Sequence, residues 1–245
     1  MSTLLVLAIA PGAFIVYKIY RQDKIEREPA ALIRKLLIAG AVSVIPVLIL
    51  EIIAGVILDG FNDMFALSDK VYVFWDAFIC TALIEEGVKY FVLKKFTWKN
   101  EEFNYTFDAI VYAVSVGMGF AIIENIEYVL ANGMGNAILR ALTSVPGHAV
   151  FAVYMGYYYG CAKLCETVGD RRGVKGFLKK SLWIPVVIHG FYDYCLMRDN
   201  GWLVLVFFIF IIALYIITIK NIGKYSANDE AISDGVIDVA YKEEQ

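Results

Sequence analysis

The chain has 245 residues, of which 60% are hydrophobic, and a formal net charge of −3. Its mean hydropathy of +0.63 is too high for a soluble domain of this length, so the composition predicts an integral membrane protein. Lys and Arg gather between apolar runs and form no single basic face, which argues against a nucleic-acid partner. The four cysteines show neither the crowding of a disulfide scaffold nor a zinc-finger spacing, and we interpret them as buried small side chains.

Seven apolar segments follow one another along the chain, and each is predicted to form a membrane helix. Their approximate bounds are 3–19, 36–58, 71–93, 108–130, 147–165, 181–197 and 202–219. The first imitates a signal peptide through Ala8-Ile9-Ala10, but Pro11 follows directly and no basic region precedes Leu4, so we predict a helix there too. The expected fold is all-α, a polytopic membrane helical bundle with about seven transmembrane helices.

Basic residues alternate between the connections and predict the orientation of the bundle. Connections 18–35, 94–99 and 163–180 are rich in Lys and Arg, as is the chain after 219, whereas the other connections contain only Lys70, Arg140 and Arg198. Since basic connections are retained on the cytoplasmic side, the N-terminus is predicted to lie outside and the C-terminus in the cytoplasm.

Residues 1–220 are predicted to form a single membrane domain without a visible internal repeat, and residues 221–245 a short acidic cytoplasmic tail. Two patterns of small residues predict helices that approach one another closely. Gly156 and Gly160 form a G-x-x-x-G spacing in the fifth segment, and Gly117 and Gly119 lie together in the fourth.

The third segment carries Glu85, Glu86 and Lys89 within a run apolar enough to cross a bilayer. Each such group costs roughly 2.5–3.5 kcal/mol near the centre of a membrane helix, so all three must face protein or water. At about 100° per residue, Lys89 projects between the two glutamates, and one ammonium can neutralise both. A carboxylate paired with Lys89 stays ionised, while a second one, desolvated and repelled by the first, is suited to act as a general acid or base. The alternative is a buried ion pair that only locks two helices together.

The fourth segment contains another candidate, Glu124, which shares a helical face with Gly117 and Phe120 deep in the apolar stretch. A functional carboxylate and a structural hydrogen bond both suit this position. Asn125 is expected to support the site or to satisfy a neighbouring group. In the second segment, Glu51 is a further intramembrane acid to which the sequence assigns no role.

The only two histidines, His148 and His189, both lie in or at the edge of membrane segments. Asp193 follows His189 by one helical turn, where its carboxylate can fix the tautomer of the ring and leave the other nitrogen for substrate, water or metal. A helix-packing hydrogen bond is the alternative role. At about 1.5 Å per residue, Glu124 and His148 are predicted one to two turns further from the cytoplasmic side than Glu85 and His189, so the sequence leaves open whether these groups meet.

Four motifs occur in order along the chain: Glu85-Glu86-x-x-Lys89, Gly117-x-Gly119-Phe120-x-x-x-Glu124-Asn125, Arg140 through Pro146-x-His148, and His189-Gly-x-x-Asp193. Together they resemble the PrsW family of bacterial membrane proteases. The stretch with Asp23-Lys24 and Glu28-Pro29 extends the likeness to roughly residues 10–195. The family is distantly similar to CAAX-processing and bacteriocin-processing membrane proteases, whose second motif ends in His where this chain has Glu124.

The resemblance implies a multi-pass protease of the bacterial plasma membrane that acts in a stress response. Its substrate is a single-pass membrane anti-sigma factor, which it cuts on the extracytoplasmic side. This site-1 cut starts regulated intramembrane proteolysis, a site-2 protease acts on the product, and a sigma factor is released.

For a protease of this kind, we hypothesise the following roles for the candidate residues. Glu85 or Glu86 activates a water, and the other is held ionised by Lys89. His189, oriented by Asp193, stabilises the oxyanion or delivers a proton. The remaining candidates, Glu124 and His148 with Asn125 in support, position water or substrate.

No cofactor is predicted, and zinc held by Glu124, His148 and His189 is the alternative, although H-E-x-x-H is absent. A proton- or metal-coupled transporter is the competing function, because buried acids and histidines also form ion sites, but the inverted repeats of such transporters are not visible. A noncatalytic scaffold leaves the paired glutamates unexplained. The sequence does not identify the substrate protein, its cut site or the inducing signal. It also does not show which glutamate is the base or what the oligomeric state is.

Overall fold

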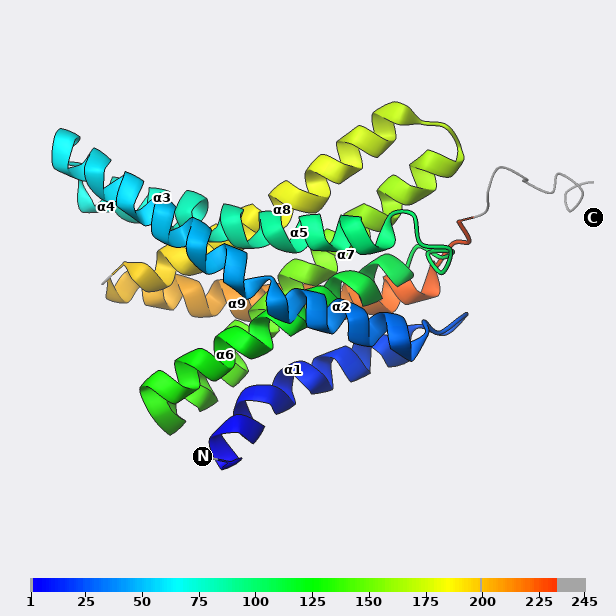
Figure 1. Ribbon diagram of the computed structural model, residues 1–245, viewed down its shortest axis with the longest axis horizontal. Helices are drawn as coiled ribbons and strands as arrows, with labels where there is room; N and C mark the ends of the chain where they lie inside the picture. The colour runs from blue at the N-terminus through cyan, green and yellow to red at the C-terminus, as the bar shows by residue number, and fades with distance from the viewer. Residues whose placement is uncertain (1, 199, 233–245) are drawn as a thin grey trace, which may run out of the picture.

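The computed structural model describes residues 2–198 and 200–232, and within these ranges the chain is almost entirely helical (Figure 1). The elements are α1 (Ser2–Gln22), α2 (Ala30–Val42), α3 (Val44–Phe65), α4 (Asp69–Trp75), the π-helix η1 (Asp76–Leu83), α5 (Ile84–Thr97), α6 (Asp108–Leu142), α7 (Ser144–Thr167), α8 (Arg171–Met197) and α9 (Gly201–Ala227). An isolated antiparallel bridge between Tyr105 and Ala231 is the one β-type pairing in these ranges. The predicted all-α fold is confirmed.

Five helical stretches of the described chain are long and apolar enough to cross a membrane, as expected of a polytopic membrane protein. They are Leu4–Gln22, Ala30–Phe65, Asp108–Gly135, Ala137–Thr167 and Gly201–Ala227. The predicted segment 71–93 lies in the continuous run of α4, η1 and α5, and 181–197 lies in α8. The number of crossings and the orientation stay predictions.

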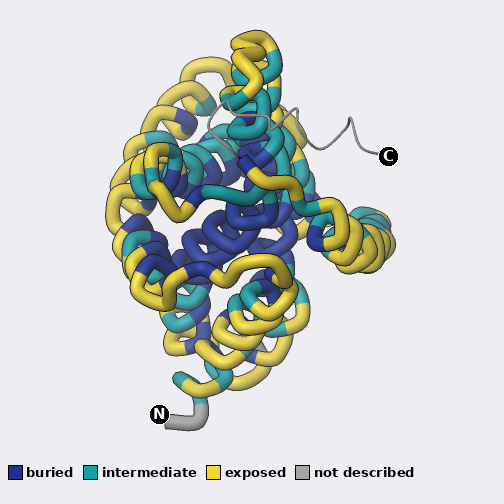
Figure 2. Tube along the Cα trace, turned by 90° about the vertical axis from the view of Figure 1, so that its right-hand side faces the viewer, coloured by how far each residue is buried: buried dark blue, intermediate teal, exposed yellow. Residues whose placement is uncertain are grey.

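Helix α6 forms the centre of the bundle. In the most apolar part of its span Asp108–Gly135, 78% of the residues are buried inside the protein. The corresponding part of α9, in Gly201–Ala227, has 22% of its residues buried. The buried residues occupy the middle of the molecule and exposed residues surround them (Figure 2). Helices α1, α2, α5 and α7 all contact α6 and cover side chains such as Tyr112 and Phe120. The exposed apolar faces of α3 and α9 are suited to contact lipid.

Glycines bring two helices into backbone contact with α6. A Cβ atom at Gly119 would lie 2.1 Å from the carbonyl oxygen of Leu37, and one at Gly40 would lie 2.0 Å from that of Val116. On the other side, a Cβ atom at Gly156 would lie 2.5 Å from a backbone oxygen of α6. The close approach predicted for these small residues is confirmed, and it holds α2 and α7 against the central helix.

Helix α6 reverses its direction at Gly133, whose φ of 77° and ψ of −161° are not helical. Arg140 Nη2 lies 3.0 Å from Glu124 Oε1, although residues 16 apart in a straight helix are separated by about 24 Å. The segment after Gly133 therefore folds back along the bundle. The predicted bounds at 130 and 147 are approximate and each lies three residues from a structural boundary, the break at Gly133 and the start of α7 at Ser144, but the helical segment between them, which ends at Leu142, was not predicted.

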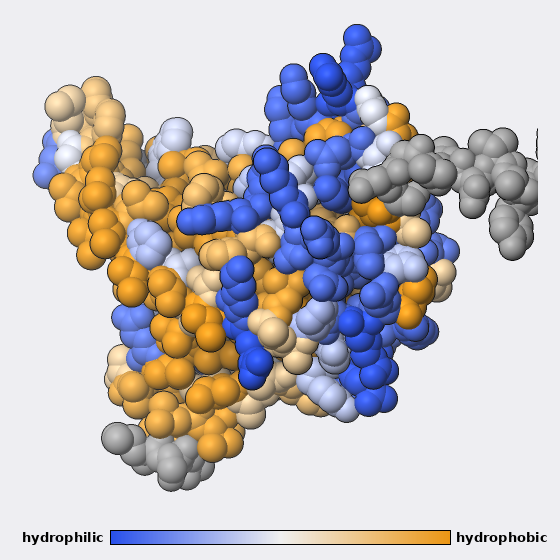
Figure 3. Space-filling view, turned by 45° about the vertical axis from the view of Figure 1, so that its right-hand side comes forward, coloured by the Kyte–Doolittle hydropathy of each residue, from blue (hydrophilic) through white to orange (hydrophobic). Residues whose placement is uncertain are grey.

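The connections rich in basic residues gather at one end of the bundle. Figure 1 places the α1–α2 and α5–α6 connections and the end of α9 together, and hydrophilic side chains dominate this end in Figure 3. Helix α9 continues to Ala227, so residues 221–227 of the predicted tail are helical. Residues 228–232 lie against the α5–α6 connection, and residues 233–245 of the tail lie outside the described residues.

The contact between α2 and α6 predicts that Gly119→Ala destabilises the protein by about 1–3 kcal/mol or more, because a backbone carbonyl cannot move aside as a side chain can. Thermal unfolding of the purified protein in detergent measures this effect. Gly223→Ala in α9 is the matched control, since a Cβ atom there meets open space and alanine favours a helix. Equal stability of the two variants would contradict the described packing.

Candidate active site

The ammonium of Lys89 lies at the centre of a buried cluster of ionisable side chains. It donates to Glu85 Oε2 at 2.7 Å and to Glu86 Oε1 at 2.9 Å. Its third polar contact is His148 Nδ1 at 3.2 Å, and the ring of Phe120 lies 4.0 Å away in a cation–π contact. All of these side chains are buried. The prediction that one ammonium serves both glutamates is confirmed.

His148 connects this cluster to Glu124. Because the Lys89 ammonium can only donate, Nδ1 of His148 accepts, and the proton of a neutral ring lies on Nε2. That nitrogen is 2.8 Å from Glu124 Oε2 and donates to it. The network thus fixes one tautomer of His148.

His189 lies between two carboxylates. Its Nδ1 is 3.1 Å from Glu86 Oε1, and its Nε2 is 3.1 Å from Asp193 Oδ2, the contact predicted from the sequence spacing. Since a carboxylate accepts and does not donate, Nδ1 donates to Glu86, whereas Asp193 Oδ2 lies close to Nε2 without a hydrogen bond between them. The ring of Phe151 stacks on His189 with a centroid distance of 4.7 Å and holds it in place.

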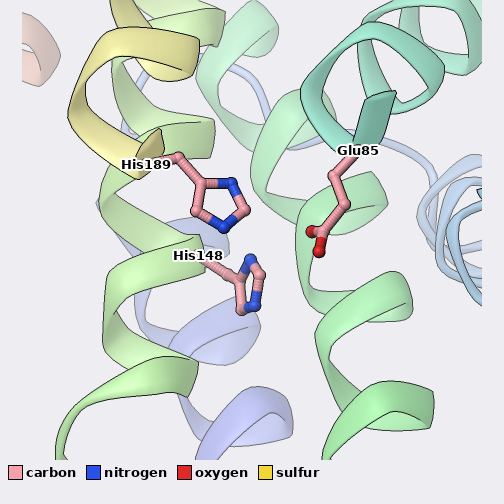
Figure 4. Close-up of side chains that lie close together, drawn as sticks. All are labelled: Glu85, His148 and His189. Carbon is pink, nitrogen blue, oxygen red and sulfur yellow. The ribbon is translucent and has the colours of Figure 1, made fainter. Parts of the chain in front are cut away.

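A cavity of about 580 Å³ opens beside these groups. Its ionisable lining comprises Glu51, Glu85, Glu124, Glu127, Arg140, His148, His189 and Asp193. The side chains of Glu85, His148 and His189 project toward one another from three different helices (Figure 4). Glu86 and Lys89 lie behind this surface and do not line the cavity. Glu85 therefore faces the cavity, whereas Glu86 faces Lys89 and His189.

Local structure explains why these groups meet although the sequence placed them at different depths. The return of the chain after Gly133 lets α7 begin deeper in the bundle, which brings His148 to Lys89. The π-helix η1 ends at Leu83, two residues before Glu85, and such widened turns often occur at functional sites. Next to His189, a Cβ atom at Gly190 would lie 2.4 Å from the Phe78 ring, so glycine allows α8 to approach η1.

Arg140 and Glu51 also line the cavity, although no role follows for either of them from the sequence. Arg140 pairs with Glu124, and its Nε donates to Asn125 Oδ1 at 3.0 Å. The Asn125 amide in turn donates to the Ala8 carbonyl at 2.9 Å, which ties this corner to α1. Glu51 lines the opposite wall from α3. Arg140 could have been found as the only basic residue of its predicted connection.

The site offers donors of the kind that bind zinc, but some of these donors already contact Lys89. Glu85, His148 and His189 each offer an atom within 4.8 Å of the others, and a glutamate with two histidines is a donor set of catalytic zinc sites. Lys89, however, occupies Glu85 and the free nitrogen of His148, and both nitrogens of His189 face carboxylates. Glu124, the carboxylate of the alternative ligand set, contacts only one of the two histidines, His148. A metal ion bound by these residues would therefore compete with Lys89 for His148 Nδ1 and for one oxygen of Glu85.

The stability of the protein is expected to depend on the Lys89 ammonium. We predict that Lys89→Gln destabilises the protein by about 3–5 kcal/mol, because two carboxylates are left buried without a cation. The double variant Lys89→Gln with Glu86→Gln recovers part of this loss. Lys94→Gln, at an exposed position of the same helix, is the control in thermal unfolding. Stability of Lys89→Gln equal to that of Lys94→Gln would contradict the described charge network.

Comparison with known proteins identifies the family of the chain. Residues 28–218 match the family model described as "PrsW family intramembrane metalloprotease". No solved structure matches the chain.

Relatives of similar length carry the name Protease PrsW. The chain is 36% identical to the protein from Geobacillus kaustophilus, over 82% of this chain and 83% of the relative. It is 35% identical to that of Oceanobacillus iheyensis, over 93% and 98%. With the Bacillus subtilis protein the identity is 30%, over 83% and 87%. The chain therefore belongs to the PrsW family of intramembrane proteases.

Proposed function

We propose that this protease makes the site-1 cut in a single-pass membrane anti-sigma factor and so starts regulated intramembrane proteolysis. The observation that carries the proposal is a carboxylate, Glu85, that faces a cavity beside two histidines within a membrane helical bundle. Membership in a protease family sets the transporter alternative aside. The anti-sigma factor and the downstream site-2 protease come from the resemblance of the motifs to this family.

Glu85 is the better general base of the two glutamates. It lines the cavity, so a water bound there can lie within hydrogen-bond reach of its carboxylate. Lys89 holds one of its oxygens and leaves the other without a hydrogen-bond partner in the described chain. In this role Glu85 takes a proton from the water as the water oxygen attacks the scissile carbonyl carbon.

Glu86 acts through its neighbours. It is fully buried, pairs with Lys89 and holds His189 Nδ1. Asp193 lies 3.1 Å from the other ring nitrogen at the cavity wall and provides a negative charge beside it. His189 held in this way can stabilise the developing oxyanion or deliver a proton to the leaving amine.

On the other side of the cavity, Glu124 and Arg140 form a charged pair that positions water or substrate together with His148. The hydroxyl groups that line the cavity include those of Thr143 and Ser144. None of the cavity hydroxyls in the described chain is hydrogen-bonded to a histidine. This arrangement supports attack by water and not by a serine or threonine.

These roles predict different kinetics for the two glutamates. With purified protein, we expect Glu85→Gln to lower kcat by about 10²–10⁴-fold, the usual contribution of a general base. Glu86→Gln is expected to lower it by about 10–100-fold and to alter the pH profile, because His189 loses an anionic partner. Glu101→Gln, at an exposed position, leaves the rate unchanged. The assignment is wrong if Glu85→Gln cleaves at the wild-type rate.

The substrate class is tested by co-expression with a single-pass anti-sigma factor tagged at both ends. We expect a shortened product that retains the membrane segment, requires Glu85 and accumulates in cells without a site-2 protease. A single-pass protein with an unrelated extracytoplasmic domain serves as the control and stays intact. If neither protein is shortened while the purified enzyme cleaves other membrane proteins, the anti-sigma assignment is excluded and the protease activity is not.

A further inference from the structure

A second group of buried acids lies at the charged end of the bundle, away from the candidate active site. Asp23 follows α1, Glu28 lies in the α1–α2 connection, and Asp108 begins α6. Each of them offers a carboxylate oxygen within 4.8 Å of the others. Asp108 and Glu124 are 16 residues apart on α6, or about 24 Å along the helix, so the two sites are separate.

The burial of these acids is nearly complete. Asp23 is 1% exposed, Glu28 4% and Asp108 0%. Four of their oxygens are buried without a hydrogen-bond partner in the described chain, namely both of Asp23, Oε2 of Glu28 and Oδ1 of Asp108. Buried carboxylate oxygens without donors are costly, and native proteins rarely leave them so.

Other groups of the described chain do not neutralise this cluster. None of its ion pairs includes Asp23, Glu28 or Asp108. Oδ2 of Asp108 accepts hydrogen bonds from the backbone amides of Asn104 at 3.1 Å and Tyr105 at 2.7 Å, and the hydroxyl of Tyr112 lies beside the Glu28 carboxyl group. The electrostatic environment is largely negative and offers one attractive neighbour, Arg27, to Asp23.

Three buried carboxyl groups this close together repel one another when they are ionised. A positive ion among the three carboxylates offsets this cost.

We propose that Asp23, Glu28 and Asp108 bind a hard divalent cation of the Mg²⁺ or Ca²⁺ type. Carboxylate oxygens are the ligands these ions prefer, and the absence of nitrogen and sulfur donors among the three residues argues against zinc. The three oxygens lie within 4.8 Å of one another, so one ion with metal–oxygen bonds of about 2.0–2.6 Å can contact all of them. The two buried oxygens of Asp23 make it the central ligand.

The cation would clamp elements that are distant in sequence. It joins the end of α1 and the α1–α2 connection to the start of the central helix α6. Nearby, Asp229 accepts hydrogen bonds from Thr106 Oγ1 and the Phe107 amide, and Ser226 Oγ donates to the Gln22 carbonyl. The site therefore stabilises the end of the bundle at which α1, α6 and α9 meet, whereas catalysis takes place elsewhere.

Manganese is the probe for this site, because Mn²⁺ takes oxygen ligands and is detected by electron paramagnetic resonance. The intact purified protein is first stripped with a strong chelator and then titrated with Mn²⁺, followed by competition with Mg²⁺ and with Ca²⁺. We expect saturable binding, displacement by one of the competing ions and a rise in the thermal unfolding temperature. A wild-type protein that binds no Mn²⁺ overturns the proposal.

Variants locate the bound ion. Asp23→Asn and Asp108→Asn are expected to weaken Mn²⁺ binding by more than about tenfold and to abolish the ion-dependent thermal shift. Glu101→Gln, an exposed acid of the α5–α6 connection, and Glu85→Gln at the active site retain both. If Glu85→Gln loses the ion and Asp23→Asn keeps it, the cation binds at the active site and the proposal is wrong.

The chelated protein provides a second readout that does not depend on measuring affinity. If the three acids only share protons and bind no ion, Asp23→Asn is more stable than wild type with or without Mn²⁺, and Mn²⁺ has no effect on either protein. That result overturns the proposal. A stabilising effect of Mn²⁺ on wild type that Asp23→Asn lacks supports it.

Discussion

The pairing of one ammonium with two carboxylates is the constraint on which the rest of the site depends. Lys89 holds Glu85 and Glu86 at 2.7 and 2.9 Å in the interior of a bundle built to lie in a membrane. Without that cation, two negative charges would remain in a medium where each costs several kcal/mol. The histidines complete the arrangement, since His148 accepts from Lys89 and His189 donates to Glu86. A single charge thus sets the orientation of every catalytic candidate on this side of the cavity.

The scaffold that holds this network is built from close helix contacts. Glycines at 40 and 119 let α2 and α6 touch, and Gly156 does the same for α7. The reversal at Gly133 returns Arg140 to Glu124, so the wall of the cavity opposite Lys89 also carries a balanced pair of charges. The close backbone contacts around α6 and the paired charges of the site together determine the position of Glu85. As a result Glu85 lies at the cavity surface, whereas the adjacent Glu86 does not.

Much of this arrangement could be predicted from the sequence, because membrane burial makes charged residues conspicuous. The helical spacing of Glu85, Glu86 and Lys89, and that of His189 and Asp193, predicted contacts that the structure contains. Convergence of the helices could not be predicted, since it depends on the backbone at Gly133 and on the depth at which α7 begins. For the same reason the pairing of Arg140 with Glu124 could not be predicted, although Arg140 belongs to one of the four motifs. The choice between the two glutamates depends on which one reaches the cavity, and helical periodicity alone does not contain that information.

We propose that the Lys89 ammonium, and not a zinc ion, provides the positive charge of the active site. Cleavage of a single-pass substrate by the purified protein, with phenanthroline in the presence of Mg²⁺, tests this proposal, because this chelator removes zinc and leaves magnesium. We expect full activity after zinc removal and no zinc in the active protein. Loss of cleavage that is restored by added zinc, but not in His148→Ala or His189→Ala, would contradict it and assign Glu85, His148 and His189 to a metal site.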